Sequence, residues 1–405
     1  MNQKLDNQGT APEAASRPKI SFVTPRFGSD ITGGAEFAAR MIAERLAKRG
    51  YTVEALTTVA GDIASWEASY DEGEKNENGV IVKRFAVDQG RSKDFAAFSK
   101  KIEFFAKSAT ADEAMEYIRL QGPVSQGLID AISDTDSDFI AFYPYLYHPV
   151  VHAMPQVLSR SVLHPAAHDE AALYLPIFNE IFEKAGRLVF HTYAEEELVK
   201  SIFRISQARR IVLGLGIDPA PPAIKLTGQE VLGLSPAEPY LCALGRVDTL
   251  KGTTMLAHFV STYRERHQKN VSLALVGPVA IAPDEQPWLK ITGQVSEEEK
   301  WAILRDCTLF VSPSYYESFS LVIMEAWSVG VPVLVNGRCA ATTEHVIRSK
   351  AGAVFQNYPE FEVALELLLD GEQIRNELGQ RGKIYVEKNF TWGVVIDRYI
   401  NFLFG

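Results

Sequence analysis

The chain has 405 residues, of which 46% are hydrophobic and 23% charged. This is the composition of a folded globular protein long enough for two domains, and it excludes a disordered chain or a mini-protein held by disulfides. The net charge of −10 repels nucleic acid and acidic lipid overall, but it permits a local basic pocket for a small anion.

The N-terminal segment 1–17 is polar and lacks the apolar core of a signal peptide, and no stretch approaches ~18 uninterrupted apolar residues. We therefore expect a disordered tail on a cytoplasmic protein. The cysteines Cys242, Cys307 and Cys339 are odd in number and lie in apolar runs. They are expected to be reduced core residues, rather than a disulfide framework or a zinc site.

Apolar runs alternate with helical patterns from residue 19 onward. The run at 19–25 is followed by a loop and by apolar residues at helical spacing up to Gly50, and later runs are separated mostly by helical segments such as 111–132 and 194–203. Helices inserted between apolar strands predict a mostly parallel sheet that is covered on both faces.

A Pro-rich stretch at 218–239 interrupts this alternation, which restarts at residue 240. The sequence therefore predicts an α/β protein with two doubly wound, Rossmann-like domains. Such domains form ligand sites where the carboxyl ends of their strands face one another across a central cleft. Functional side chains are expected in loops that follow strands.

Two segments allow a functional and a structural interpretation. Over 91–107, a helical stripe of aromatic and aliphatic residues lies beside several lysines, and it could dock on a membrane surface or an acceptor. We favour a core-facing stripe with a charged rim, because Asp94 and Glu103 dilute the charge. The segment 134–138 resembles a carboxylate pair for a metal, but it precedes a strand, which favours a turn.

The loop over 25–36 places Gly33 and Gly34 directly before a helix, where the backbone can approach an anion closely. It does not have the spacing G-x-G-x-x-G, which argues against a nicotinamide dehydrogenase. A plain tight turn explains this loop equally well.

The loop over 243–252 also follows a strand. Arg246 and Lys251 can converge on one anion there, with the guanidinium binding two oxygens and the ammonium acting as a point charge, which suits a diphosphate. The alternative is a pair of solvated loop charges.

The segment 312–337 is the most specific. Ser318 or Ser320 is expected to cap a helix, with Glu317 at its mouth and Glu325 about two turns along the same side. Carboxylates on an otherwise apolar helix are costly without partners, so we expect them to accept hydrogen bonds from hydroxyl groups of a ligand.

Together these motifs resemble the retaining GT-B glycosyltransferases of family 4, the glycosyl transferases group 1, over roughly residues 19–403. The resemblance rests on the following residues: Gly33-Gly34-Ala35-Glu36, Gly245-Arg246, Lys251-Gly252, Pro313-Ser314, Glu317 and Glu325 in E-x7-E spacing, Gly330-x-Pro332-Val333 and Phe390-Thr391-Trp392. It implies an acceptor-binding domain over 18–217, a nucleotide-sugar-binding domain over 218–387 and a C-terminal helix, 388–405, that returns to the first domain.

The resemblance also implies individual roles. Arg246 and Lys251 would hold the diphosphate, Glu325 the ribose and Glu317 the donor sugar. The backbone N–H groups of Ser320 and Leu321 would bind a phosphate. Gly34 would approach the donor phosphate from the opposite domain. Val295, with Gln294, would lie beside the nucleobase.

His168 resembles the family's cleft histidine, with His164 as a competing choice and a structural histidine as the alternative for either. The sequence departs from the family's usual E-G-F-G by having E-S-F-S, with Ser318 and Ser320 in the glycine positions. This departure puts a simple transfer of donor specificity in doubt.

The expected function is therefore transfer of a sugar from a nucleoside-diphosphate sugar to an acceptor hydroxyl, with retention at the anomeric carbon and without a metal or other cofactor. The alternatives are a GT-B phosphorylase or epimerase, and a nucleotide-sugar-binding subunit that has lost catalysis. We expect no nucleic-acid partner and at most peripheral membrane contact.

Overall fold

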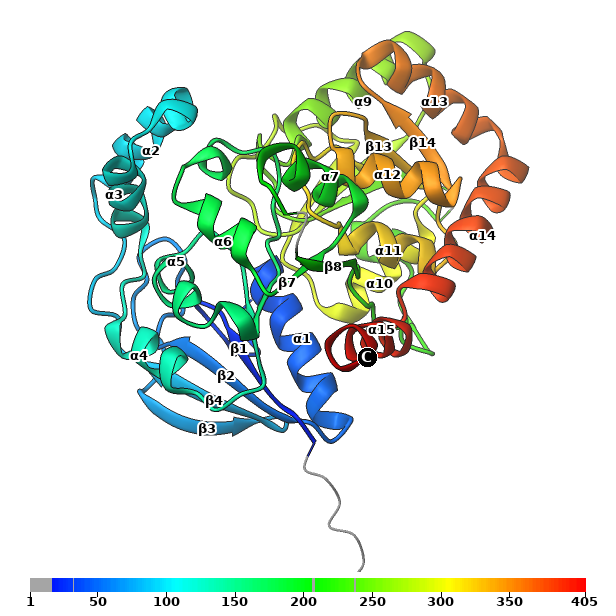
Figure 1. The fold of residues 1–405 in the computed structure, drawn as a ribbon. Helices are drawn as coiled ribbons and strands as arrows, with labels where there is room; N and C mark the ends of the chain where they lie inside the picture. The colour runs from blue at the N-terminus through cyan, green and yellow to red at the C-terminus, as the bar shows by residue number, and fades with distance from the viewer. Residues whose placement is uncertain (1–16, 32, 206–207, 237) are drawn as a thin grey trace, which may run out of the picture.

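The computed structural model describes residues 17–405 except 32, 206, 207 and 237, so the predicted tail falls almost entirely outside the described residues. The described chain contains two sheets, each covered by helices (Figure 1). The strand order is β3-β4-β2-β1-β5-β6-β7-β8 in the first sheet and β11-β10-β9-β12-β13-β14 in the second. The strands pair in parallel, except that β3 and β4 are antiparallel.

The first domain contains the following elements: β1 (Lys19–Val23), α1 (Gly34–Lys48), β2 (Thr52–Thr58), β3 (Gly73–Glu77), β4 (Val80–Phe85), α2 (Phe95–Phe105), α3 (Ala111–Gln121), α4 (Gln126–Asp134), β5 (Phe139–Phe142), α5 (His148–Ala153), β6 (Ser161–Leu163), α6 (Phe178–Lys184), β7 (Arg187–Phe190), α7 (Tyr193–Ile202) and β8 (Arg209–Val212).

The second domain and the C-terminal helix contain the following elements: α8 (Gly228–Leu232), β9 (Tyr240–Leu244), α9 (Thr253–His267), β10 (Ser272–Val276), β11 (Leu289–Gly293), α10 (Glu297–Asp306), β12 (Leu309–Ser312), α11 (Leu321–Ser328), β13 (Val333–Asn336), α12 (Ala340–Ser349), β14 (Gly352–Phe355), α13 (Tyr358–Asp370), α14 (Glu372–Asn389) and α15 (Trp392–Phe404).

The predicted α/β class with two doubly wound sheets is confirmed, and three details differ from the prediction. The edge strands β3 and β11 were not predicted, because β3 is almost entirely exposed and β11 is only half-buried, so neither shows a strong apolar run. The helical segment predicted over 111–132 is two helices, α3 and α4, with Gly122 and Pro123 between them.

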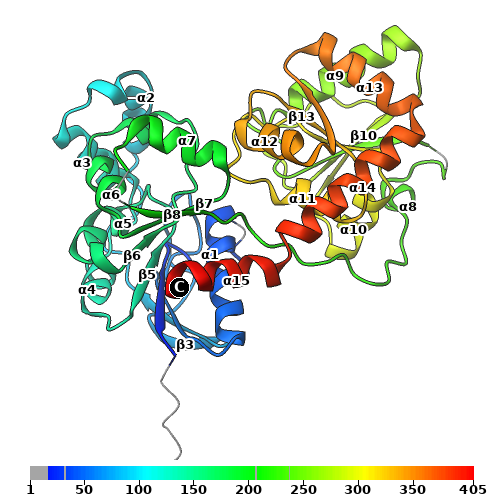
Figure 2. The same ribbon diagram turned by 45° about the vertical axis from the view of Figure 1, so that its right-hand side comes forward.

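The chain crosses between the domains twice (Figure 2). The outgoing segment pairs with the returning one at Ile217, whose N–H donates to the carbonyl of Phe390 over 2.9 Å. Most of the Pro-rich stretch 218–239 packs on the second domain: α8 lies against α10, and the N–H of Gly228 donates to Asp306 over 2.9 Å. The two crossing segments, rather than the whole of 218–239, therefore connect the domains.

The three cysteines and the helical stripe over 91–107 both contribute to the core, the stripe only in part. All three cysteines are buried and free. In α2, Ile102 is buried and Phe95 and Phe98 pack on the core, whereas the side chain of Phe105 is 58% exposed. The core-facing interpretation therefore holds for most of the stripe but not for its C-terminal end. No helix within the described residues is long and apolar enough to span a bilayer.

Candidate functional site

The loop between β9 and α9 brings the two predicted cations together. Buried Asp248 accepts a hydrogen bond from the N–H of Lys251 over 2.6 Å and another from the guanidinium of Arg246. Gly252 has φ +71°, and a Cβ there would lie 2.3 Å from the carbonyl oxygen of Pro313. This loop therefore needs glycine to pack closely on the loop after β12, which carries Glu317.

Glu317 faces the cations from that neighbouring loop. Its carboxylate pairs with the Lys251 ammonium over 2.7 Å, and both side chains line one pocket together with Arg246. The Arg246 side chain is 54% exposed, so its guanidinium can reach a ligand. The pocket lies at the carboxyl ends of β9 and β12, which pair directly.

Glu325 has a partner that the sequence did not reveal. Lys300 on α10 pairs with its carboxylate over 3.1 Å. Burial raises the pKa of Glu325, and the charge of Lys300 opposes that rise. Lys300 was not among the predicted residues, because only the tertiary fold brings α10 beside α11. The ion pair compensates the partial burial of Glu325, so burial alone does not argue for a ligand there.

The predicted serine cap of α11 is wrong. Ser320 occupies the N-cap position with φ +72°, and no side-chain hydrogen bond caps the helix. Left-handed backbone directs the hydroxyl of Ser320 away from the cap geometry, and its Oγ is buried without a hydrogen-bond partner among the described residues. The backbone N–H groups at Ser320 and Leu321 still stand at the helix start.

His168 faces the second domain across a cavity of about 510 Å³. The cavity is also lined by Glu317 and by Tyr316, whose ring centroid lies 5.7 Å from that of His168. The competing choice, His164, is buried and shares a 2.9 Å hydrogen bond with the hydroxyl of Tyr399 on α15, and burial lowers its pKa. His164 therefore anchors the C-terminal helix, and His168 is the histidine in the cleft.

The remaining predicted residues lie outside these two pockets. Gly33 precedes α1, and a Cβ there would meet the carboxylate of Glu36 at 2.2 Å, whereas an added Cβ at Gly34 has open space around it. The N-terminal end of α1 lies on the side of the first domain that faces the second (Figure 1; Figure 2). Val295 is partly buried against the core between β11 and α10, with Gln294 exposed beside it.

Four residues that contact the predicted site residues or line a pocket with them were not predicted. Asp248 orients the cation loop, Lys300 pairs with Glu325, and Glu195 and Arg338 line the same cavity as His168. The signal for Asp248 was present, because a carboxylate between two cations in one short loop is a natural hydrogen-bond acceptor for them. For Arg338 and Glu195 the sequence offered no comparable signal, since only the closeness of the two domains places them together.

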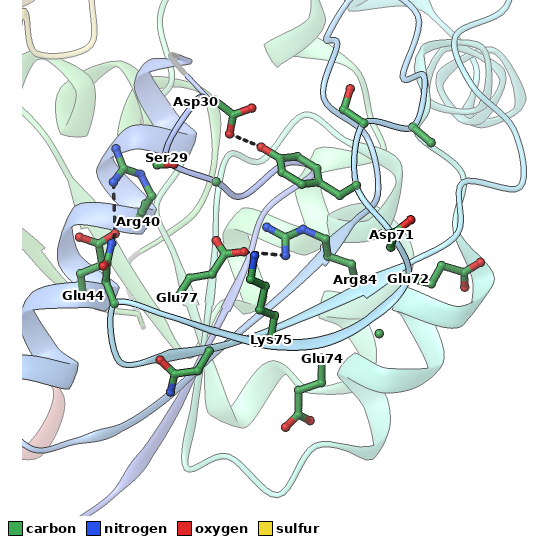
Figure 3. A pocket seen from close by; sticks show the side chains of 17 residues that line it. Ser29, Asp30, Arg40, Glu44, Asp71, Glu72, Glu74, Lys75, Glu77 and Arg84 are labelled. Carbon is green, nitrogen blue, oxygen red and sulfur yellow. Dashed lines mark hydrogen bonds and ion pairs between the residues drawn. The ribbon is translucent and has the colours of Figure 1, made fainter.

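A larger pocket of about 980 Å³ lies within the first domain, between the loop at 28–30, α1 and the β3–β4 hairpin (Figure 3). Its charged lining consists of six carboxylates and three cations: Asp30, Glu44, Asp71, Glu72, Glu74 and Glu77 against Arg40, Lys75 and Arg84. Arg40 and Arg84 are already paired, over 3.1 Å and 2.9 Å. This acidic surplus suits a diphosphate poorly, whereas the Arg246–Lys251 loop suits it well.

Within the residues that the structure describes, no group of three histidine, cysteine or acidic side chains could hold a metal ion.

Comparison with known proteins agrees with this geometry. Residues 227–385 match the family model of glycosyl transferases group 1. A D-inositol 3-phosphate glycosyltransferase of Stackebrandtia nassauensis is 26% identical over 62% of this chain and 61% of its own length. This chain thus spans about three fifths of the length of two curated relatives that it matches.

Solved structures share the whole architecture. The sucrose-phosphate synthase of Thermosynechococcus elongatus superimposes with a TM-score of 0.66 at 18% identity, covering 95% of this chain and 98% of its own. Alr3699/HepE of Anabaena, in complex with UDP and glucose, gives 0.65 at 14% identity, covering 96% and 99%. At such low identity, the likeness establishes the two-domain GT-B fold alone.

Proposed function

We propose, on the premise that residues 227–385 form a glycosyl transferases group 1 domain, that the protein is a retaining glycosyltransferase. It would move a hexose-type sugar from a nucleoside-diphosphate sugar to an acceptor hydroxyl, in glycan or glycoconjugate synthesis. One observation carries the proposal: Glu317 contacts Lys251 in the cation pocket and also lines the cavity that holds His168. One carboxylate thus joins a diphosphate-type site to a cleft between two domains.

The proposed chemistry follows from charge. As the diphosphate leaves, negative charge grows on its oxygens and the anomeric carbon gains oxocarbenium character. Arg246 and Lys251 would stabilise that developing charge more than they stabilise the bound donor, which is the condition for catalysis. Glu317 would accept hydrogen bonds from the sugar, and His168 would support the sugar or the acceptor hydroxyl. Family resemblance favours front-side attack, with the leaving phosphate taking the acceptor proton.

The same two cations supply the charge that a divalent metal would otherwise provide, so we propose that transfer is metal-independent. Transfer rates should not change when EDTA is added. Activity that EDTA abolishes and magnesium restores would contradict this part of the proposal.

The comparisons suggest the first substrates to test. UDP accompanies glucose in one structural neighbour, and the relatives are named for an inositol phosphate acceptor. A thermal-shift screen of UDP-, GDP-, ADP- and dTDP-sugars would identify the donor, because a tight ligand raises the melting temperature by mass action. Transfer to inositol phosphates, sugar phosphates and free sugars would then be followed by NMR, which reports the anomeric configuration of the product.

The NMR assay separates the rival functions. A retained anomeric configuration in a product that requires the acceptor supports the proposal. Turnover of the donor with inorganic phosphate in place of the acceptor would indicate a phosphorylase. Turnover of the donor without any acceptor would indicate an epimerase. Donor binding without transfer or donor hydrolysis, over a broad acceptor panel, would indicate a binding subunit that has lost catalysis.

A further inference from the structure

Helices α3, α8 and α10 begin with the same local pattern, a Ser or Thr followed three residues later by Glu. In each helix, the hydroxyl of the capping residue accepts a hydrogen bond from the backbone N–H of the glutamate. The carboxylate of the glutamate in turn accepts a hydrogen bond from the backbone N–H of the capping residue. The three glutamates, Glu113, Glu230 and Glu299, have lowered pKa values, because hydrogen bonds stabilise their charged forms. These are ordinary capping boxes.

Helix α7 begins with the same pattern but uses its glutamate differently. The Thr192 hydroxyl accepts from the N–H of Glu195 over 3.1 Å, as in the other helices. The Glu195 side chain, however, is buried and accepts from the N–H of His191 over 2.6 Å and from that of Ala167 over 2.8 Å. The second bond reaches a different segment of the chain, the loop after β6.

That loop carries His168 into the cleft. Ala166 has φ +53°, a left-handed conformation that is strained for a residue with a Cβ and persists only when its surroundings hold it. The bond from Ala167 to Glu195 lies directly between this strained residue and His168. Glu195 and His168 line the same cavity, and β6 and β7, which precede their two loops, pair directly.

A capping role alone does not require this arrangement. Burying a carboxylate is costly, and the glutamates of α3, α8 and α10, none of which is buried, cap their helices without the full cost. The titratable group that faces Glu195 within the described structure is the buried imidazole of His191, whose Nδ1 lies 3.8 Å from the carboxylate. The contact that distinguishes Glu195 from the three capping glutamates is the one to the His168 loop.

We infer that Glu195 is a positioning residue, which fixes the loop over 165–168 and so sets the place of the His168 ring in the cleft. The inference rests on the proposed function, because it assigns the role to the same transfer site. A small displacement of a positioned group can lower the rate of the chemical step by as much as about 10²-fold. Loss of Glu195 should therefore act on turnover and leave donor affinity nearly unchanged.

The test compares E195Q, H168A and the double variant, with E113Q as the matched control from an ordinary capping box of the same domain. We expect E195Q to lower kcat by about 10- to 100-fold with little change in the donor KM, and E113Q to leave both unchanged. Because Glu195 acts through His168, adding E195Q to H168A should lower kcat no further. An equal loss in both backgrounds would overturn the inference.

A second readout does not depend on activity. NMR shifts of the His168 ring should change in E195Q and stay unchanged in E113Q. E195D, which keeps the carboxyl group but is too short to span both N–H groups, should move them too if E195Q does not fold. Unmoved ring shifts in a folded Glu195 variant would overturn the inference. Normal transfer by H168A would instead contradict the proposed role of His168 and, with it, any positioning by Glu195.

Discussion

The ion pair between Lys251 and Glu317 joins the two loops that carry the predicted donor site. A ligand with a diphosphate beside a sugar could replace this contact by binding its phosphate to the cation and its hydroxyls to the carboxylate. Asp248 holds the Lys251 backbone and the Arg246 guanidinium in place, so the cations need little reorganisation when charge develops.

Arg246→Ala should lower turnover by about 10²- to 10³-fold, or ~3 kcal/mol, by analogy with loss of one preorganised oxyanion donor. Lys251→Ala should behave alike. Initial rates with the intact donor measure the effect. Lys269→Ala removes a half-buried cation of the same domain, paired with Asp370, and serves as the control. Equal rates for Arg246→Ala and Lys269→Ala would exclude a role for Arg246 in transfer.

Ser320 stands in left-handed backbone where the family usually has glycine, and its buried hydroxyl has no partner within the described structure. A left-handed conformation costs a residue with a Cβ roughly 1–2 kcal/mol, and substitution by glycine removes this cost. Part of the gain is lost, because unfolded glycine has more conformational freedom than unfolded serine. Ser320→Gly should therefore raise the free energy of unfolding by about 1 kcal/mol in urea titrations. A less stable variant would show that the hydroxyl contributes a favourable contact.

Among the elements, α7 and α11 show what local pattern can and cannot predict. The alternation of apolar runs predicted most of the strands, because burial on both faces of a parallel sheet leaves a clear signal. It missed β3, whose Gly-Glu-Lys-Asn-Glu sequence has no apolar residue. Local pattern could not predict the missing side-chain cap of α11, because the left-handed backbone of Ser320 decides it, or the partner of the Glu195 side chain, because Ala167 is distant in sequence.

The start of α7 also predicts a pH dependence of stability. Burial raises the pKa of Glu195 to about 8, against opposing hydrogen bonds from backbone N–H groups, so the folded state binds its proton more tightly than the unfolded state does. The stability that the folded state gains from binding this proton is fully present below about pH 4.5 and is lost as the pH rises towards 8.

Relative to Glu195→Gln, the wild-type protein should therefore lose a few kcal/mol of unfolding free energy between pH 5 and pH 8, at about 1.4 kcal/mol per pH unit. Urea titrations of both proteins at intervals across that range measure the difference. Parallel curves would show that Glu195 titrates normally in the fold.

On the scale of the whole molecule, the two crossings and α15 tie the domains together beside the cleft. The doubly wound topology predicted that loops after the strands would meet across the cleft. The sequence did not show which part of the Pro-rich stretch connects the domains, because most of that stretch packs on the second domain. The two segments that cross between the domains are paired at Ile217 and Phe390, and the domains can rotate about this pair of segments.

We expect saturating donor and acceptor to close the cleft by rotation about this connection, because Glu317 and His168 lie in different domains. Small-angle scattering should then report a smaller radius of gyration than for the free protein. Identical profiles with and without substrates would argue against appreciable closure.

We propose that a nucleoside-diphosphate sugar lies across the cleft, with its ribose at Glu325 and its sugar at Glu317. Calorimetric binding of the free nucleoside diphosphate to Glu325→Gln and Glu317→Gln, beside kinetics with the intact donor, tests it most directly. We expect weakened nucleotide binding in Glu325→Gln, and normal nucleotide binding with impaired transfer in Glu317→Gln. Loss of nucleotide binding in Glu317→Gln, with binding and turnover intact in Glu325→Gln, would contradict it.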